Sequence, residues 1–581
     1  MDFSFFEKLN VRKFRKMTNI GHKPRRLVIH PRLNNFISRI IDGETIQKQF
    51  NSIHFFDDDF KIMSDEYCYA FIIPPEVEVM RHVKFIVDLA RNELPKSAQN
   101  PKFFIELWFQ PRINNVVCAW MIDMKFAPQS IIDTFPSKEN PSKIEPYRQL
   151  EVYNLELDVT PLDDDVLTIE SRYSFVRAWS FRDLTVVSEM RQALNVIRSH
   201  TGFVNITAIG SLSSAIARTL NAPSSTNQTQ LILIDRSADL ITPTITQMNY
   251  EGIIAEFFGI DCGLVKITND RGQSQLQLLS SQEDQLFGSL RSMTHQEASA
   301  EIENRMAAVT GAFGQKSAGG SLEEGLAKFR KTAKVSVENK TLIDHINIMQ
   351  KALELMNHSK YFKRIMNEEA NALSGASSIK QLVTQMMESG ADFRQVIRML
   401  CLESLLKGGV EKDYQKFVNQ IIFNYGFQMV LYLIRLQDCG LFSPNNTKWS
   451  QFVKSFQLFV PDWDQTNDQA AAPYLGYVPL SVRYIQRVLN NDFNSIQKAM
   501  GELKQECYEN CADPNNRRSG NVLVCFVGGC THSELNALRR LRQKDSNYAN
   551  VQFQLLTTNM TSSNEFFENL AYLIPGWTPT I

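Results

Sequence analysis

The sequence contains no apolar run long enough to cross a lipid bilayer. A membrane-spanning helix needs about 18 or more consecutive apolar residues, and the best candidates, 427–434 and 522–527, are short and end in polar residues. Near the N-terminus, lysine and arginine interrupt the apolar side chains, so no uninterrupted apolar segment of a secretory signal is present. We therefore expect a cytoplasmic protein that does not span a membrane.

The chain also has little net charge and few cysteines. Its 62 Lys and Arg against 63 Asp and Glu give a formal net charge of -1, which provides no overall attraction to nucleic acid or to anionic lipid. The nine cysteines are scattered, mostly within apolar segments, as is typical of reduced, buried thiols. One set comes closest to a metal site but lacks the paired C-x-x-C spacing of structural zinc: Cys507, Cys511, Cys525, Cys530 and His532. We expect no disulfide framework, no metal and no nucleic-acid partner.

Catalytic motifs are lacking as well. The sequence has no G-x-S-x-G elbow, no H-E-x-x-H and no nucleophile with an evident base. Glycine turns at Gly210 and at Gly528 and Gly529 follow apolar runs, a shape that can receive a phosphate. They lack the lysine of a P-loop and the third glycine of a dinucleotide fingerprint. We therefore predict no catalytic residue, no cofactor and no enzyme.

Two carboxylates, Asp235 and Asp239, follow an apolar run, at the place where open α/β sheets bind ligands. They could hold Mg²⁺, which leaves a nucleotide-binding or phosphoryl-transfer enzyme as an alternative. Since no phosphate-binding loop accompanies them, we prefer a structural interpretation. In it, Asp235 and Arg236 pair or bond the backbone, Thr242 caps the next helix, and Pro243 fills its first turn.

The length of 581 residues predicts two to four domains. The first third alternates β-branched or aromatic runs with amphipathic segments, which predicts a small α/β domain with a mostly parallel sheet. Three prolines, Pro136, Pro141 and Pro146, then indicate a boundary. A second α/β unit opens near Glu151 and includes apolar runs typical of strands covered on both faces.

From about residue 251 to 468 the pattern is helical, with no convincing strand. Leu342, Ile346, Met349, Leu353 and Met356 recur at spacings of four and three, which places them on one helix face. The glycine- and serine-rich stretch 310–325 has little apolar surface to offset its ordering entropy. It predicts a mobile loop between two hairpin arms, 286–309 and 322–355.

Strand signals return only at 522–527 and 551–556. Two strands alone do not make a stable sheet. We therefore expect them to join the sheet begun between residues 151 and 234, which makes the helical region an insertion into the second domain.

Two basic clusters could contact partners. An N-terminal cluster could contact acidic lipid or an acidic helix, and a cluster on the second hairpin arm could contact charged coiled-coil segments. For the N-terminal cluster we prefer a solvated helix flank without a partner; for the second cluster, an exposed helix face explains the pattern at least as well. The first cluster comprises Arg12, Lys13, Arg15, Lys16, Lys23, Arg25 and Arg26, and the second Lys328, Arg330, Lys331 and Lys334.

Five segments share the pattern of one known family: 161–167, 231–260, 397–404, 476–483 and 526–539. The signature residues within them are Asp235, Arg236, Asp239, Thr242, Pro243, Tyr250, Tyr477, Pro479, Arg483, Gly528 and Gly529. In this order, and along nearly the whole chain, they resemble the SM (Sec/Munc) family in the form used by its vacuolar-sorting branch.

The resemblance implies an α/β plus α fold: a three-domain arch with two mostly parallel sheet domains and a helical domain inserted into the second. The signature residues would then be mainly structural. The implied boundaries are a basic N-terminal helix at 1–23, domain one at 24–145, domain two at 146–245 and 473–581, and domain three at 246–472, with a projecting hairpin at about 285–356.

The resemblance also implies partners. Qa- and R-type SNARE helices would bind the hairpin of domain three and its cleft with domain one. A helical-solenoid subunit of a HOPS- or CORVET-like tether would contact domains two and three. The protein would reach late endosome, lysosome or vacuole membranes only through these partners.

The sequence departs from the family in three places. His30 stands where the family more often has Asp, residues 108–112 keep only part of a domain-one motif, and the hairpin segment 295–340 matches poorly. A purely architectural tether subunit without SNARE contact therefore remains an alternative.

Overall fold

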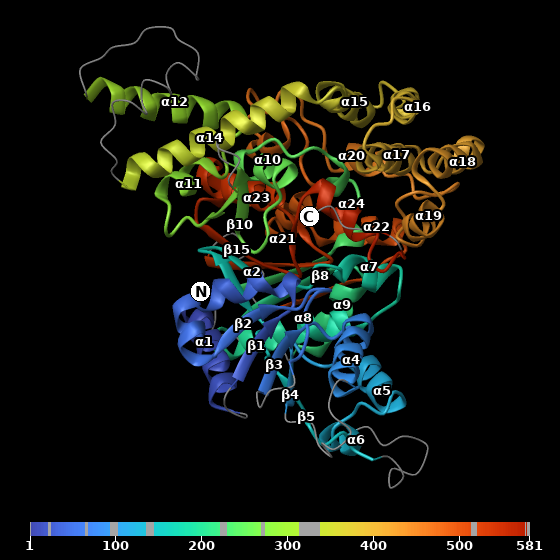
Figure 1. Ribbon diagram of the computed structural model, residues 1–581. Coiled ribbons are helices and arrows are strands. Elements are labelled where there is room, and N and C mark those ends of the chain that lie inside the picture. The colour runs from blue at the N-terminus through green and yellow to red at the C-terminus, as the bar shows by residue number, and fades with distance from the viewer. Residues whose placement is uncertain are drawn as a thin grey trace. The chain divides into compact units, whose positions relative to one another are not determined.

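The computed structural model describes residues 2–20, 25–63, 68–92, 103–134, 145–220, 229–268, 274–312, 337–512, 520–575 and 577. The chain divides into two compact units, Asp2–Pro161 and Leu162–Ile581. Each unit is built on its own mainly parallel sheet, and most of the remaining helices belong to the second unit (Figure 1). The predicted α/β plus α fold class is confirmed.

The first unit has a five-stranded parallel sheet in the order β2-β1-β3-β4-β5. Its central strand β3 is buried along its whole length, and the apolar face of α4 packs on the same core. The elements are α1 (Ser4–Asn19), β1 (Arg25–Ile29), α2 (Pro31–Ile40), α3 (Gly43–Gln49), β2 (Ser52–Phe55), β3 (Cys68–Ile73), α4 (Val77–Asn92), β4 (Phe104–Phe109), α5 (Asn115–Asp123), α6 (Gln129–Thr134) and β5 (Leu150–Asn154).

The predicted boundary between residues 145 and 146 is wrong. Strand β5 pairs with β4 and so belongs to the first sheet. Val159, which follows β5, also contacts the first unit, because its carbonyl oxygen accepts a hydrogen bond from the Asn10 side chain of α1 at 2.8 Å. The proline-containing segment therefore connects α6 to an edge strand of the same unit; Pro136 and Pro141 lie outside the described residues.

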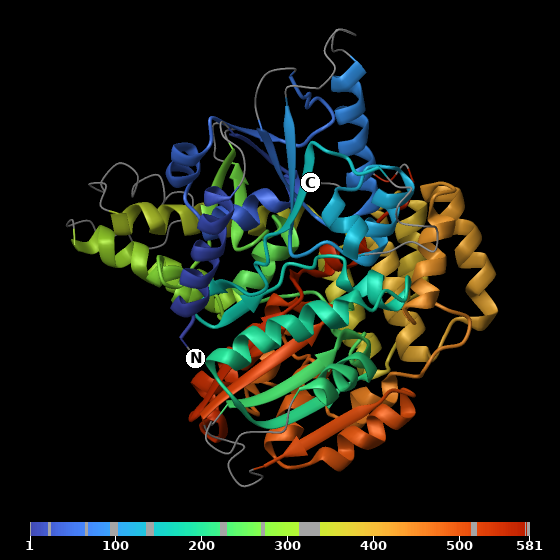
Figure 2. The same ribbon diagram turned by 90° about the horizontal axis from the view of Figure 1, so that it is seen from below.

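The second unit has a seven-stranded sheet in the order β12-β8-β9-β13-β15-β7-β6. Strand β13 lies parallel between β9 and β15, with Phe526 opposite Ile234. Figure 2 shows strands from both ends of this unit side by side. The prediction that the C-terminal strands join the earlier sheet is confirmed. The strands are β6 (Thr160–Asp163), β7 (Val166–Thr168), β8 (Phe203–Ile209), β9 (Thr229–Asp235), β12 (Cys507–Cys511), β13 (Gly520–Val527) and β15 (Val551–Thr557).

The helices of this sheet domain come from both sides of the insertion. They are α7 (Ser174–Trp179), α8 (Thr185–His200), α9 (Ser211–Thr219), α21 (Leu480–Leu489), α22 (Phe493–Glu502), α23 (His532–Lys544) and α24 (Ser563–Asn569). A separate two-stranded sheet joins β14 (Cys530–Thr531) to β16 (Met560–Thr561), and so ties the N-terminus of α23 to that of α24.

The insertion between β9 and α21 is mostly helical, but the prediction that it contains no strand is wrong. Strands β10 (Leu264–Thr268) and β11 (Ser274–Leu278) form an antiparallel hairpin. Alternating apolar and polar residues produce it, a pattern too short to stand out beside long helices. The helices are α10 (Tyr250–Phe257), α11 (Gln285–Leu290), α12 (His295–Ala312), α14 (Val337–His358), α15 (Phe362–Ser374), α16 (Lys380–Glu388), α17 (Phe393–Lys407), α18 (Tyr414–Tyr425), α19 (Met429–Asp438) and α20 (Ser450–Ser455).

Helices α12 and α14 run side by side and project from the second unit (Figure 1). The predicted apolar face of α14 is confirmed, since Leu342, Ile346 and Met349 are buried in the core that α14 shares with α10, α11 and α12. The predicted loop lies largely outside the described residues, as do Lys328, Arg330, Lys331 and Lys334.

Candidate functional site

The carboxylate of Asp235, at the end of β9, binds the backbone. It accepts hydrogen bonds from the backbone N–H groups of Leu212 and Ser213, both at 2.8 Å, and from the Ser213 hydroxyl at 2.6 Å. It thereby caps the first turn of α9. Burial raises the pKa of Asp235 to about 6, although these hydrogen bonds favour the charged form. These contacts match the preferred interpretation, in which Asp235 bonds the backbone.

Arg236 binds a residue that the sequence analysis did not pair with it. Its guanidinium makes two hydrogen bonds to Glu534 of α23, at 2.8 and 3.0 Å, and a third to the Asp239 carbonyl oxygen at 3.0 Å. Glu534 also closes a capping box with Thr531 at the start of α23. Both side chains of the pair are completely buried, so this ion pair joins the two chain segments of the sheet domain in its core.

Asp239 organises the next turn. Its carboxylate accepts from the Thr242 hydroxyl at 2.5 Å and from the Ser481 backbone N–H at 2.9 Å. The Tyr477 hydroxyl lies 2.9 Å from the Thr242 hydroxyl. The predicted cap by Thr242 is wrong, because its hydroxyl is bound to Asp239, whereas Pro243 does lie in the first turn of a short 3-10 helix at Thr242–Thr244.

The glycine turn after β13 is filled by protein atoms. Gly528 has a φ of +100°, and a Cβ there would lie 2.7 Å from the Trp179 ring. Gly529 has a φ of +99° and lies against Asn559. At both positions the left-handed backbone and the close packing favour glycine.

The other signature residues lie in the same unit but not in this network. Pro479 precedes the first residue of α21. Arg483 pairs with Asp468 at 2.6 Å. The Tyr250 hydroxyl lies 2.6 Å from His345 Nδ1 on α14, so it ties the start of α10 to the root of the hairpin.

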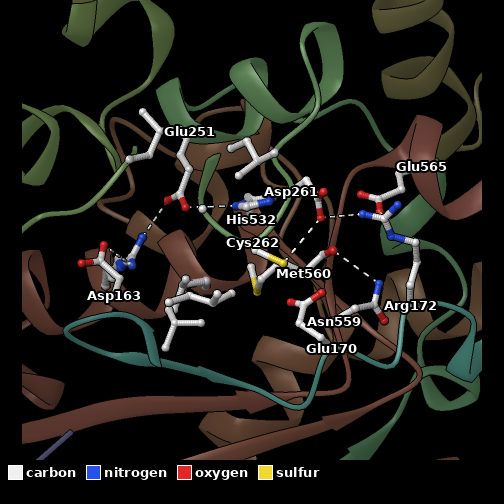
Figure 3. A pocket seen from close by; sticks show the side chains of 17 residues that line it. Asp163, Glu170, Arg172, Glu251, Asp261, Cys262, His532, Asn559, Met560 and Glu565 are labelled. Carbon is white, nitrogen blue, oxygen red and sulfur yellow. Dashed lines mark hydrogen bonds and ion pairs between the residues drawn. The ribbon is translucent and has the colours of Figure 1, made fainter. Parts of the chain in front are cut away.

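A second buried network joins the insertion to the sheet domain. Glu251 of α10 accepts from Arg539 at 2.7 Å and is bonded to His532 Nδ1 at 3.0 Å, both on α23. Burial alone would raise the pKa of Glu251, but Arg539 and the hydrogen bonds from its partners hold it well below its usual range. Figure 3 shows Glu251 and His532 pointing toward each other on one side of a small cavity.

The described residues contain two groups whose carboxylate or thiol atoms converge closely enough for a metal ion. Asp163, Asp164 and Asp165 form one, and they already face Arg291. Glu170, Asp261 and Cys262 form the other. Asp235 with Asp239 is in neither group, nor are the cysteines and histidine considered above. Cys525 and Cys530 are buried, as predicted for core thiols, whereas Cys507 and Cys511 on β12 are only partly buried, contrary to the prediction.

An exposed apolar surface, the α18–α19 patch, was missed by the sequence analysis. Phe423 is 89% exposed, Phe427 79%, Leu431 47% and Ile434 51%. The opposite face of α19 is also apolar and is buried through Tyr432, whose hydroxyl donates to the Phe567 carbonyl oxygen at 2.6 Å. A short helix that is apolar on all sides predicts burial on two sides, which is the signal that could have revealed the patch.

The root of the hairpin is fixed to α23. Arg540 donates to Glu297 of α12 with contacts of 2.6 and 3.1 Å. Thr294 and Glu297 exchange hydrogen bonds at the start of that helix. The direction in which the described part of the hairpin leaves the unit is therefore set by the sheet domain.

The N-terminal basic cluster is partly used within its own unit. Lys13 lies 3.3 Å from Asp158, and Arg25 forms a buried ion pair with Glu106. Lys23 lies outside the described residues. Lys13 and Arg25 are thus paired within the unit, and Arg25 lies buried in β1 rather than on a solvated helix flank.

Among the described residues, none of the helices combines the length and the apolar character that a membrane crossing requires.

Comparison with known proteins places these features in a family context. The model of the Sec1 family matches residues 26–569. Vacuolar protein sorting-associated protein 33A of Rattus norvegicus is 22% identical over 544 residues, which cover 86% of each chain. The vacuolar protein-sorting-associated protein 33 homolog of Arabidopsis thaliana is 23% identical over 568 residues, 89% of each. A solved complex of the SM protein Vps45 with the Qa SNARE Tlg2 matches over 98% of each chain, with a TM-score of 0.56 and 12% identity, which establishes the fold alone.

Proposed function

The chain belongs to the Sec1 family, and from this premise we propose that it binds SNARE helices and assists their assembly during vesicle fusion at endosomes, lysosomes or vacuoles. The observation that carries the proposal is the match over 26–569, together with relatives of the vacuolar-sorting branch. The Vps45 structure, which shares this fold, was solved with a Qa SNARE.

The proposed mechanism needs no covalent chemistry. A Qa-SNARE and an R-SNARE held side by side in register would lose less entropy when they nucleate their four-helix bundle. The paired helices α12 and α14 offer an elongated helical surface for this purpose (Figure 1). Because Arg540 and His345 fix the root of the hairpin, this surface has a defined direction within the second unit.

We further propose that the α18–α19 patch docks a helical-solenoid subunit of a HOPS- or CORVET-like tether. Phe427, Leu431 and Ile434 follow one another at spacings of four and three, which suits the packing of one helix against another. Two phenylalanines that are mostly solvent-exposed are typical of an anchor for a partner rather than of free surface.

Co-purification tests the proposal. The full chain, tagged and isolated from its native source, should bring down a solenoid tether subunit. The purified chain should bind at least one member of a panel of endosomal Qa-, Qb-, Qc- and R-SNARE helices. If the solenoid binds and every SNARE fails, the chain is the architectural subunit and the assembly role is wrong.

A further inference from the structure

A small cavity lies where three parts of the second unit meet: the turn after β7, the turn before β10, and α24. Its volume is about 30 Å³, enough for one or two water molecules. Glu170 and Arg172 line it from the first turn, Asp261 and Cys262 from the second, and Glu565 from α24 (Figure 3). The cavity therefore lies on the junction between the sheet domain and the helical insertion.

The charges around the cavity do not balance. Three carboxylates, those of Glu170, Asp261 and Glu565, surround one guanidinium. Arg172 donates to Asp261 at 2.7 Å and lies 3.5 Å from Glu565, so it bridges the insertion and α24. Glu170 accepts from the Thr168 hydroxyl at 3.0 Å.

The other ionisable groups that line the cavity, among the described residues, have hydrogen-bond or ion-pair partners of their own. His532 of α23 lines the cavity but is bonded to Glu251. Cys262 contributes a buried thiol 3.5 Å from Asp261, and burial raises the pKa of that thiol far above its usual value. Arg539 and Asp163, on the side of Glu251, lie 3.9 Å from each other.

The backbone is strained at the same place. Glu170 has a φ of +51° and Cys262 a φ of +53°, a conformation that residues other than glycine rarely adopt. Two strained turns that face one cavity indicate a site that the surrounding fold holds in place.

The pKa of the Glu170 carboxyl lies close to neutral pH. Burial, followed by repulsion from Asp261, raises its pKa to about 7, although Arg172 and the Thr168 hydroxyl favour the charged form. In an unfolded chain a glutamate has a pKa of about 4.3. The folded state therefore keeps the Glu170 proton up to neutral pH.

We propose that Glu170 is a proton-controlled latch between the insertion and the sheet domain. With the Glu170 carboxyl protonated, Arg172 holds Asp261 and Glu565 together. When the proton is lost, three carboxylates compete for one guanidinium, and the turn that carries Asp261 loosens from the sheet domain.

The sign of the pH dependence follows from the raised pKa. The stabilisation is fully present below the unfolded pKa and is lost as pH rises through about 7. Between pH 6 and 8, the unfolding temperature of the full chain should fall by roughly 2 °C. Hydrogen exchange of peptides covering 258–268, corrected for the intrinsic pH effect, should rise several-fold over the same interval.

Glu170→Gln mimics the protonated carboxyl. It should remove the pH dependences of the unfolding temperature and of hydrogen exchange in 258–268. Glu303→Gln, which removes the same charge from an exposed position on α12, should keep them. The latch is overturned if wild type shows no such dependence, or if Glu170→Gln retains it. Should Glu170→Gln fail to fold, Asp261→Asn decides, because loss of its repulsion must move the midpoint to lower pH and an unmoved midpoint overturns the proposal.

Discussion

Arg236 and Glu534 lie 298 residues apart in the chain and form a two-bond ion pair with no solvent exposure. Glu534 also accepts from the Ser481 hydroxyl at 2.5 Å and caps its own helix. One carboxylate thus connects the strand before the insertion, the first helix after it and the start of α23. Residues from distant signature segments therefore meet at one buried carboxylate.

Replacement of Glu534 by glutamine should destabilise the second unit by about 3–5 kcal/mol, because it leaves the Arg236 charge buried and without its carboxylate. Denaturant unfolding measures this loss. Glu506→Gln is the matched control, since Arg218 and Glu506 form an ion pair of similar sequence separation at 2.6 Å on the exposed surface. It should cost about 1 kcal/mol or less. Equal losses in both variants would contradict the structural role of the buried pair.

Gly210→Ala should destabilise the same unit by about 2 kcal/mol or more. Gly210 has a φ of +108°, and a Cβ there would lie 2.4 Å from the Asp235 side chain, so strain and overlap add. Gly501→Ala, inside α22 with no atom within 4 Å of the new Cβ, should instead gain about 0.5–1 kcal/mol. Thermal unfolding of the two variants compares them directly, and a neutral Gly210→Ala would show that the turn can shift.

The sheet topology was predictable because its strands are short, continuous apolar runs bounded by turn residues. The continuous apolar runs of β9 and β13 indicate strands buried on both faces. Neither strand has enough neighbouring strands in the sequence to form a stable sheet, so the two had to pair across the insertion. Strand β5 was missed because its edge position leaves it half-buried and weakly patterned. The three prolines before it then favoured a domain boundary over a connection.

The side-chain contacts of the signature residues were less predictable, because they join segments that are far apart in the sequence and meet only in the folded chain. Asp235 and Arg236 are neighbours in sequence, yet one binds α9 and the other α23. No local pattern assigns Glu534 to Arg236. The apolar run 427–434 indicates that two faces of α19 are suited to burial, but it does not indicate which of the two faces the chain itself leaves exposed.

His30 predicts a loss of stability of the first unit in mild acid. Its Nδ1 accepts from the Arg32 backbone N–H and caps α2, and burial, with nearby Arg32 and His82, lowers its pKa to about 3. Because the unfolded chain binds a proton near pH 6.5, stability is complete above that pH and falls below it by up to about 1.4 kcal/mol per pH unit. Hydrogen exchange of β1 and α2 between pH 7 and 5 measures the effect.

His30→Asn keeps an N-cap acceptor without a titrating group, so exchange in this region should become independent of pH after intrinsic correction. His358→Asn, at an exposed position on α14, serves as the control and should behave as wild type. Unchanged acid sensitivity in His30→Asn would assign the effect to another group.

The enzyme alternative predicts nucleotide binding, and the geometry opposes it. The Asp235 and Asp239 carboxylates are occupied by protein donors, and Trp179 fills the turn at Gly528. ATP or GTP with Mg²⁺ should therefore leave the unfolding temperature unchanged, whereas a ligand at a hundred times its Kd would add about 2.7 kcal/mol. A nucleotide-dependent shift that Asp235→Asn abolishes would revive the alternative.

The α18–α19 patch gives the sharpest test of tether docking. Aspartate at both Phe423 and Phe427 would place charges in the centre of the proposed interface, and loss of such anchors costs about 2 kcal/mol or more each, or about 30-fold in affinity. Because both side chains are mostly exposed, the stability of the chain should change by about 0.5 kcal/mol or less. Leu276→Asp, at a 56% exposed position on β11, should leave binding unchanged. Calorimetry with the purified solenoid subunit measures tether binding, and pull-downs with SNARE helices measure SNARE binding in parallel. If the double variant still binds the solenoid subunit, docking takes place elsewhere on the chain. If the double variant loses SNARE helices as well, the two binding surfaces are coupled.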